Sequence, residues 1–154
     1  MKLRIYTDTS VIGGCLDVEF RSPSVRLFEK FHSGEAIVVL SDLTLLELAS
    51  APKKVHDALI GIPEEHREYV VLTAEAKELA ELYRSEGVLG PGKRIDAQHI
   101  AIATISRVNV LVSWNFQHIV NLERIRGYNS INVREGYPVL EIRSPWEVFV
   151  DEES

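Results

Sequence analysis

The sequence contains little cysteine and no long apolar run. Cys15 is its one cysteine, so an internal disulfide is excluded and a reducing compartment is the expected setting. No apolar stretch approaches the roughly 20 residues that a helix needs to cross a bilayer, and residues 1–10 lack the apolar core of a signal peptide. We therefore expect a soluble, cytoplasmic protein without a membrane-spanning segment.

Positive charge is also scarce. The chain has 17 lysines and arginines against 23 aspartates and glutamates, which gives a net charge of -6. Phosphates are attracted by basic surfaces, so the overall charge does not favour a nucleic-acid ligand. A cluster of acidic residues that holds a metal ion would account for part of this excess. The 5 histidines and single cysteine are too scattered for a zinc site.

Length and composition are those of one ordinary globular domain. The 154 residues are 45% hydrophobic and 26% charged, and they are too few for two domains of ordinary size. We predict a single domain over residues 1–150 and a frayed acidic tail over 151–154.

Short apolar segments alternate with amphipathic ones along the chain. Five strands are predicted, at 3–8, 36–40, 69–72, 109–113 and 139–142. Helices are predicted to begin at Ser22 and Pro23, at Ser41 or Asp42, at Pro52, at Thr73, at residue 95, and at a capping box formed by Ser144 and Glu147. This order predicts an α/β fold of three layers, with a parallel sheet of about five strands between helices. Such sheets bind ligands beyond the carboxyl ends of their strands.

Three acidic residues and one asparagine lie at this edge of the predicted sheet. Asp8 ends the first strand, Glu47 lies on the helix after the second, Asp96 opens the helix before the fourth, and Asn115 follows the fourth. Carboxylates that lie close together repel one another unless a cation lies between them. Magnesium and manganese prefer oxygen ligands. We therefore predict a site for Mg²⁺ or Mn²⁺.

Each acid also has a purely structural explanation. Asp8 would cap the following turn, Asp96 would be the N-cap of its helix, and Glu47 would lie on the solvent face. However, Glu47 is flanked by Leu46 and Leu48, and a carboxylate in apolar surroundings needs a partner or a ligand. The ordered combination of the three acids favours a site.

The segments around these residues resemble the PIN-domain family, which includes the VapC-type toxins of bacteria. They are YTDTSVI around Asp8, LLEL around Glu47, DAQHIAIA from Asp96 and LVSWNF around Asn115. The resemblance extends from Leu3 to about Val148. It implies a five-stranded parallel sheet, acidic residues that hold magnesium or manganese, and RNA as the substrate.

The resemblance also implies roles for particular residues. Asp8 and Asp96 would bind the metal directly or through water, Glu47 would complete the ligands or orient the attacking water, and Ser10 would support them. Asn115 stands where the family usually has a fourth aspartate. The site would then hold three negative charges instead of four and bind metal more weakly.

Other residues are candidates for contacts with RNA. Lys93 and Arg94, in the loop before Asp96, would position the phosphate backbone. His118 would assist at a phosphate or be an ordinary surface histidine. His99 would touch the acids or satisfy its hydrogen bonds in the core. The resemblance further implies an antitoxin partner and a homodimer.

Other enzyme classes with an aspartate after the first strand fit less well. A haloacid-dehalogenase-type phosphatase would need a second aspartate where Ser10 stands, and a receiver domain would need one after the third strand. Gly13 and Gly14 lack the lysine and spacing of a phosphate loop.

We predict a hydrolytic, metal-dependent endoribonuclease, the toxin of a type II toxin–antitoxin pair. The alternative, which Asn115 and the acidic charge favour, is a PIN-like module that binds RNA or protein without cleaving.

Overall fold

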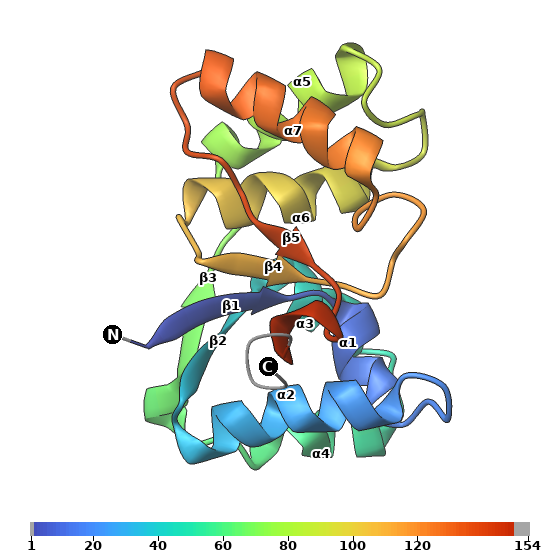
Figure 1. Cartoon of the computed structure of the whole chain (residues 1–154), viewed down its shortest axis with the longest axis vertical. Coiled ribbons are helices and arrows are strands. Elements are labelled where there is room, and N and C mark those ends of the chain that lie inside the picture. Colours follow the sequence, from blue (N-terminus) through green and yellow to red (C-terminus); the bar gives the residue numbers. More distant parts are fainter. Residues whose placement is uncertain (1, 150–154) are drawn as a thin grey trace.

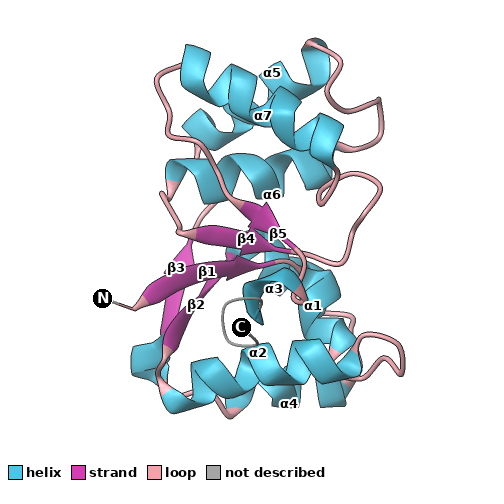
Figure 2. Ribbon diagram, viewed as in Figure 1, coloured by secondary structure: helices cyan, strands magenta, loops and turns pink. Residues whose placement is uncertain are grey.

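The computed structural model describes residues 2–149. Five parallel strands form one sheet in the order β3-β2-β1-β4-β5, and helices cover both of its faces (Figure 1, Figure 2). The strands are β1 (Leu3–Thr7), β2 (Ala36–Ser41), β3 (Arg67–Val70), β4 (Val110–Val112) and β5 (Ile142–Arg143). The helices are α1 (Thr9–Gly14), α2 (Arg21–Ser33), α3 (Asp42–Leu48), α4 (Lys53–Ile60), α5 (Ala74–Ser85), α6 (Arg94–Ile105) and α7 (Leu122–Arg134), with 3-10 turns at Glu64–His66 and Glu147–Phe149.

The predicted three-layer α/β fold is confirmed by this arrangement. Within the described residues, no helix has the length and apolarity needed to cross a membrane. The acidic tail predicted over 151–154 lies outside the described part of the chain.

The two faces of the sheet carry separate apolar cores. Successive residues of a strand point to opposite faces, so Ile5 packs in one core and Tyr6 in the other, as do Val38 and Val39. Helices α5, α6 and α7 lie above the sheet in Figure 1, and α1, α2 and α4 lie below it. Burial on both faces explains why the strands are continuous apolar runs.

The order of the strands reverses at β1. Strand β2 pairs with one edge of β1 and β4 pairs with the other. In open parallel sheets, ligands bind beyond the carboxyl ends of the strands at such a reversal. Asp8 directly follows β1, so the fold places this carboxylate at the expected position for a ligand site.

Four of the predicted helix starts are confirmed. One is Pro52, which is the N-cap of α4, and the other three have hydrogen-bonded caps. Ser41 caps α3 by accepting a hydrogen bond from the Thr44 N–H at 3.1 Å, and Thr73 caps α5 in the same way. At the last turn, the Ser144 N–H donates to Glu147 Oε1 at 3.3 Å, which is one of the two hydrogen bonds of the predicted capping box.

Other boundaries differ from the prediction. Helix α2 begins at Arg21 with Phe20 as its N-cap, so the assignment of Ser22 as the cap is wrong. Pro23 lies within the first turn, where a missing N–H costs no helical hydrogen bond. Strand β3 begins two residues early, at Arg67, because its pairing with β2 sets its limits. Strand β5 is reduced to two residues.

Helix α7 was not indicated by the sequence pattern. It contains Gly127 and Asn132, which are poor helix formers. Contacts with other elements stabilise it instead. Tyr83 Oη donates to Asn132 Oδ1, and Asn132 Nδ2 donates to Thr104 Oγ1 at 3.3 Å. A Cβ at position 127 would lie 2.9 Å from Val88, so glycine is what allows this close approach.

Helix α1 was also not predicted, and Gly14 near its end lies against the loop after β4. A Cβ at position 14 would be 2.6 Å from Ser24 Oγ and 2.8 Å from Trp114 Nε1, two atoms that hydrogen-bond to each other at 2.8 Å. We expect Gly14→Ala to lower the free energy of unfolding by about 1–3 kcal/mol through overpacking, measured by denaturant titration.

Gly13→Ala provides the matched control. A Cβ at position 13 would meet no atom within 4 Å, and alanine is favoured over glycine in helices by roughly 0.5–1 kcal/mol. This variant should therefore be as stable as the wild type or slightly more stable. Equal unfolding free energies for the two variants would contradict the proposed contact at Gly14.

Candidate metal site

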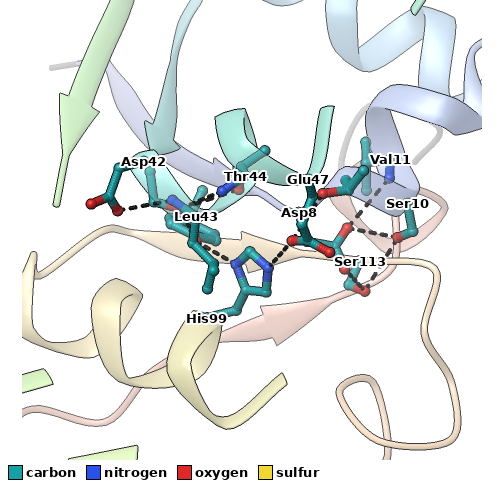
Figure 3. Close-up of polar contacts among 12 residues, drawn as sticks. Asp8, Ser10, Val11, Asp42, Leu43, Thr44, Glu47, His99 and Ser113 are labelled. Atoms are coloured by element: carbon teal, nitrogen blue, oxygen red, sulfur yellow. Dashed lines mark hydrogen bonds and ion pairs between the residues drawn. The ribbon is translucent and has the colours of Figure 1, made fainter. Parts of the chain in front are cut away.

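Asp8 is buried directly after β1, with 6% of its surface exposed. Its Oδ1 accepts hydrogen bonds from Ser10 Oγ at 2.6 Å and from the Val11 N–H at 3.3 Å, and its Oδ2 accepts from Ser113 Oγ at 2.6 Å (Figure 3). The bond to Val11 caps α1, so the structural explanation for Asp8 is confirmed. Burial raises the pKa of the Asp8 carboxyl, and the hydroxyl donors oppose this rise.

No lysine or arginine among residues 2–149 forms an ion pair with Asp8. A buried carboxylate is costly unless hydrogen bonds or a positive charge stabilise it. Asp8 has the hydrogen bonds but no lysine or arginine partner among these residues. A hard divalent ion would supply that charge and would accept carboxylate oxygens as ligands. The surroundings of Asp8 therefore fit Mg²⁺ or Mn²⁺.

Glu47 reaches the same end of the sheet from α3. Its Oε1 accepts hydrogen bonds from His99 Nε2 at 2.7 Å and from Thr9 Oγ1 at 3.2 Å, and Thr9 is the residue after Asp8. The bond from His99 is the main reason why the pKa of Glu47 is lowered. The inference that Glu47 needs a partner is confirmed by these contacts. Of its two apolar neighbours, Leu48 is buried and Leu46 is 72% exposed. What holds Glu47 is a polar contact that the local sequence does not reveal.

His99 connects Glu47 to the interior of the domain. It is 3% exposed, and its Nδ1 lies 2.6 Å from Tyr6 Oη, which lies 2.8 Å from Ser41 Oγ. Both ring nitrogens therefore have partners. Both predictions for this residue are correct. His99 is a core histidine with its hydrogen bonds satisfied, and it also contacts an acid of the candidate site.

Asp96 lies half-buried in the first turn of α6. The N-cap of this helix is Lys93, so the reading of Asp96 as the cap is wrong. Among residues 2–149, no three histidine, cysteine, aspartate or glutamate side chains lie close enough together to hold one metal ion. The structure links Asp8 and Glu47 through Thr9 but does not bring Asp96 into the same cluster. Its role as a ligand stays a prediction.

Comparisons with known proteins bear on the fold. No protein-family model and no curated protein matches the sequence. Among solved structures, the chain is similar to VapBC2 from Rickettsia felis bound to a promoter DNA fragment, with a TM-score of 0.56 at 14% identity over 92% of this chain and 98% of that one. It is also similar to VapC20 from Mycobacterium tuberculosis, a sarcin–ricin loop cleaving toxin, with a TM-score of 0.54 at 14% identity over 89% and 98%. For FitAcB from Neisseria gonorrhoeae, the TM-score is 0.57 at 13% identity over 92% and 98%. The chain has the PIN-domain fold.

In this fold, Asn115 occupies the loop after β4. Its Oδ1 accepts a hydrogen bond from the His118 N–H at 3.0 Å, and its own N–H donates to Ser113 Oγ at 2.9 Å. The Asn115 amide therefore caps a turn, and Ser113 connects it to Asp8. Sequence reasoning missed Ser113, for which the only available signal was a hydroxyl placed at the end of a predicted strand.

The predicted RNA contacts fall into two groups. His118 is half-buried, and its pKa is lowered first by burial and then by the charge of Lys93, whereas Asp96 acts in the opposite direction. The charges of Lys93 and Asp96 are thus near enough to act on His118. Arg94 instead lines a hollow of about 440 Å³ on α5 and α6, together with Lys77, Glu81, Arg84 and Gln98. Adjacent basic residues therefore face different surfaces.

Proposed function

We propose that this chain is a divalent-metal-dependent endoribonuclease that hydrolyses the phosphodiester bonds of RNA, and that it is the toxin of a type II toxin–antitoxin pair. The observation that carries the proposal is the Asp8 carboxylate, which is buried after β1, linked to Glu47 through Thr9, and not paired with any lysine or arginine among residues 2–149. The similarity in fold to a toxin that cleaves the sarcin–ricin loop supports RNA as the substrate.

The acids of the site would hold the metal. Asp8, Glu47 and Asp96 would bind Mg²⁺ or Mn²⁺, with the Asn115 amide as a neutral oxygen donor. When bound, the ion would activate water and offset the charge that develops on the phosphate. Ser10 fixes one oxygen of Asp8 at 2.6 Å, and Ser113 fixes the other at the same distance. The carboxylate is therefore already oriented before substrate arrives.

The substrate would approach over the start of α6. Lys93 and His118 would contact the phosphate backbone next to Asp96, which would concentrate positive charge where the acidic chain otherwise repels RNA. Arg94 would reach only a part of the RNA that extends over the hollow between α5 and α6.

Metal-dependent RNA cleavage tests this proposal. Labelled RNA with Mn²⁺ or Mg²⁺ should be cleaved by the purified protein, and a chelator should stop the reaction. We expect Asp96→Asn to slow cleavage by roughly 100-fold, the usual cost of losing one group that stabilises charge in the transition state. The Asp96 side chain is not seen to bond to other described residues, so the fold should be unaffected. Cleavage that persists with the chelator would contradict the proposal.

Asn115 supports a second function. Its Oδ1 already caps a turn, and no third acid joins Asp8 and Glu47 in a metal-binding group within residues 2–149. A PIN-like module that binds RNA or protein without cleaving it would have this arrangement. Binding to RNA without any metal-dependent cleavage, across a varied panel of RNAs, would favour this second function.

Restoring the fourth acid should strengthen metal binding. We expect Asn115→Asp to tighten Mn²⁺ binding by about 10-fold, or roughly 1.4 kcal/mol. Aspartate keeps the acceptor for the His118 N–H, because the two residues are equivalent caps, and it adds a negative charge. Calorimetric titration would measure the change.

Asn121→Asp is the control for this substitution. Asn121 caps α7 by accepting from the Arg124 N–H at 3.2 Å, so the variant adds the same charge at a second asparagine cap. Its affinity for Mn²⁺ should match that of the wild type. An Asn115→Asp protein that binds no more tightly than Asn121→Asp would exclude position 115 from the metal site.

We also propose that an antitoxin protein covers the site and that two copies of this chain form a homodimer in the cytoplasm. Solved VapBC and FitAB complexes with the same fold support a protein partner. An inhibitor would present basic side chains or a helix to the acidic site, since complementary charge favours association. Analytical ultracentrifugation of the chain alone and with the product of a neighbouring gene would test both assemblies.

A further inference from the structure

The two oxygens of the Glu47 carboxylate have different surroundings. Oε1 accepts both hydrogen bonds, from His99 Nε2 at 2.7 Å and from Thr9 Oγ1 at 3.2 Å. No described residue donates a hydrogen bond to Oε2. The Glu47 side chain is also 36% exposed, so a ligand can reach this oxygen. One oxygen of Glu47 is therefore held by the protein, and the other is free to bind a ligand.

The chemistry of these groups determines the direction of each hydrogen bond. An ionised carboxylate can only accept, so the proton between His99 and Glu47 belongs to His99 Nε2. A neutral imidazole then has Nδ1 as an acceptor, and the Tyr6 hydroxyl, 2.6 Å away, donates to it. Tyr6 in turn accepts from Ser41 Oγ at 2.8 Å. With these assignments, each hydrogen bond in the series Ser41, Tyr6, His99 and Glu47 has one donor and one acceptor.

We propose that His99 is a positioning residue for Glu47. Tyr6 fixes His99 as the tautomer with its proton on Nε2, and His99 holds Oε1 so that Oε2 is directed to the metal or to the attacking water. This inference rests on the proposed function, in which Glu47 serves the metal site. It assigns a role to a residue that is buried and cannot itself touch RNA.

The position of His99 on α6 supports this role. His99 follows Asp96 by three residues, so the two side chains project from the same side of the helix. One helix would thus supply both an acid of the site and the group that orients a second acid. Partners that orient ligands of this kind typically change metal affinity by 10- to 100-fold when they are removed.

The affinity for Mn²⁺ tests the proposal without relying on RNA cleavage. We expect calorimetric titration to show binding that is about 10- to 100-fold weaker in His99→Leu. His99→Gln should recover part of the loss, because its amide can donate to Oε1. Tyr6→Phe should weaken binding less, since it removes only the group that fixes the tautomer. Tyr83→Phe, which loses a buried hydroxyl that bonds to Asn132, is the control and should bind as the wild type does.

The ¹⁵N NMR signals of the His99 ring in the wild type give a second test, which remains valid if His99→Leu does not fold. They should show a protonated Nε2 and an unprotonated Nδ1. In Tyr6→Phe this preference should weaken. A His99 ring protonated on Nδ1 in the metal-free wild type would overturn the proposal.

The outcomes separate this inference from the proposed function. If Glu47→Gln weakens Mn²⁺ binding and His99→Leu does not, the positioning role is overturned while the metal site stands. If the folded wild type binds no Mn²⁺, both are overturned. Weak binding in His99→Leu with partial recovery in His99→Gln supports the positioning role, because a generally damaged core would not be repaired by an amide.

Discussion

Asp8→Asn is expected to remove Mn²⁺-dependent stabilisation and to abolish RNA cleavage while leaving the metal-free fold intact. In the wild type, Mn²⁺ at 100 times its dissociation constant should stabilise the native state by about 2.7 kcal/mol. For a domain of this size, that corresponds to a rise in Tm of roughly 5–10 °C. Asparagine lacks the charge that binds the ion, so the variant should show no such rise in thermal unfolding with and without Mn²⁺.

Without metal, Asp8→Asn should be at least as stable as the wild type at pH 7. Asparagine is as good an N-cap as aspartate. Burial raises the pKa of Asp8 above its value of about 3.9 in the unfolded chain. The stability contributed by the protonated form is therefore fully present below that value and is lost as the pH rises through the folded pKa. Asparagine does not ionise and avoids this loss.

The pH dependence provides the matching control. The metal-free wild type should lose stability relative to Asp8→Asn as the pH rises above about 4, in a series of denaturant titrations. A variant that is much less stable than the wild type at pH 7 would mean that the hydrogen bonds from Ser10, Val11 and Ser113 stabilise the ionised carboxylate by themselves. The carboxylate would then have no need of a cation.

Lys93→Glu should reduce RNA cleavage by about 10-fold or more at low salt, whereas Arg94→Glu should have a much smaller effect. The charge of Lys93 acts on His118 next to Asp96, but Arg94 lines the hollow between α5 and α6. Charge reversal at a phosphate contact removes an attraction and adds a repulsion. Values of kcat/KM over a range of salt concentrations would measure both effects.

Lys93→Glu and Arg94→Glu are controls for each other, because they make the same change of charge at neighbouring positions. The difference between them should shrink as salt rises, since exposed charges are screened. Equal losses in both variants would indicate a general effect of net charge. Unchanged RNA binding in both would remove these residues from the substrate contacts.

The central strands could be predicted because burial on both faces produces a continuous apolar run in the sequence. Val38 and Val39 point to opposite cores, so β2 is apolar without interruption. Asp8 could be predicted for a related reason, since it directly follows such a strand. Helix α7 could not be predicted, because Gly127 and Asn132 are poor helix formers whose role depends on contacts with distant parts of the chain.

Only part of the site could be predicted, because its contacts are distant in sequence. Ser113 bonds to Asp8 across 105 positions, and His99 bonds to Glu47 across 52. Neither contact produces periodicity or a local motif. The segments that resemble PIN domains identified which acids to consider. They did not show that Glu47 is held by a histidine from another helix or that Asn115 serves as a cap.

The contact between Glu47 and His99 has a consequence for the cooperativity of unfolding. It joins α3, which directly follows β2, to α6. The start of α6 therefore cannot open without breaking this bond to α3, and amide hydrogen exchange there should report on Glu47. A cleavage-deficient protein meant to capture intact RNA is then better made at Asp96, because that change leaves the link between the two helices in place.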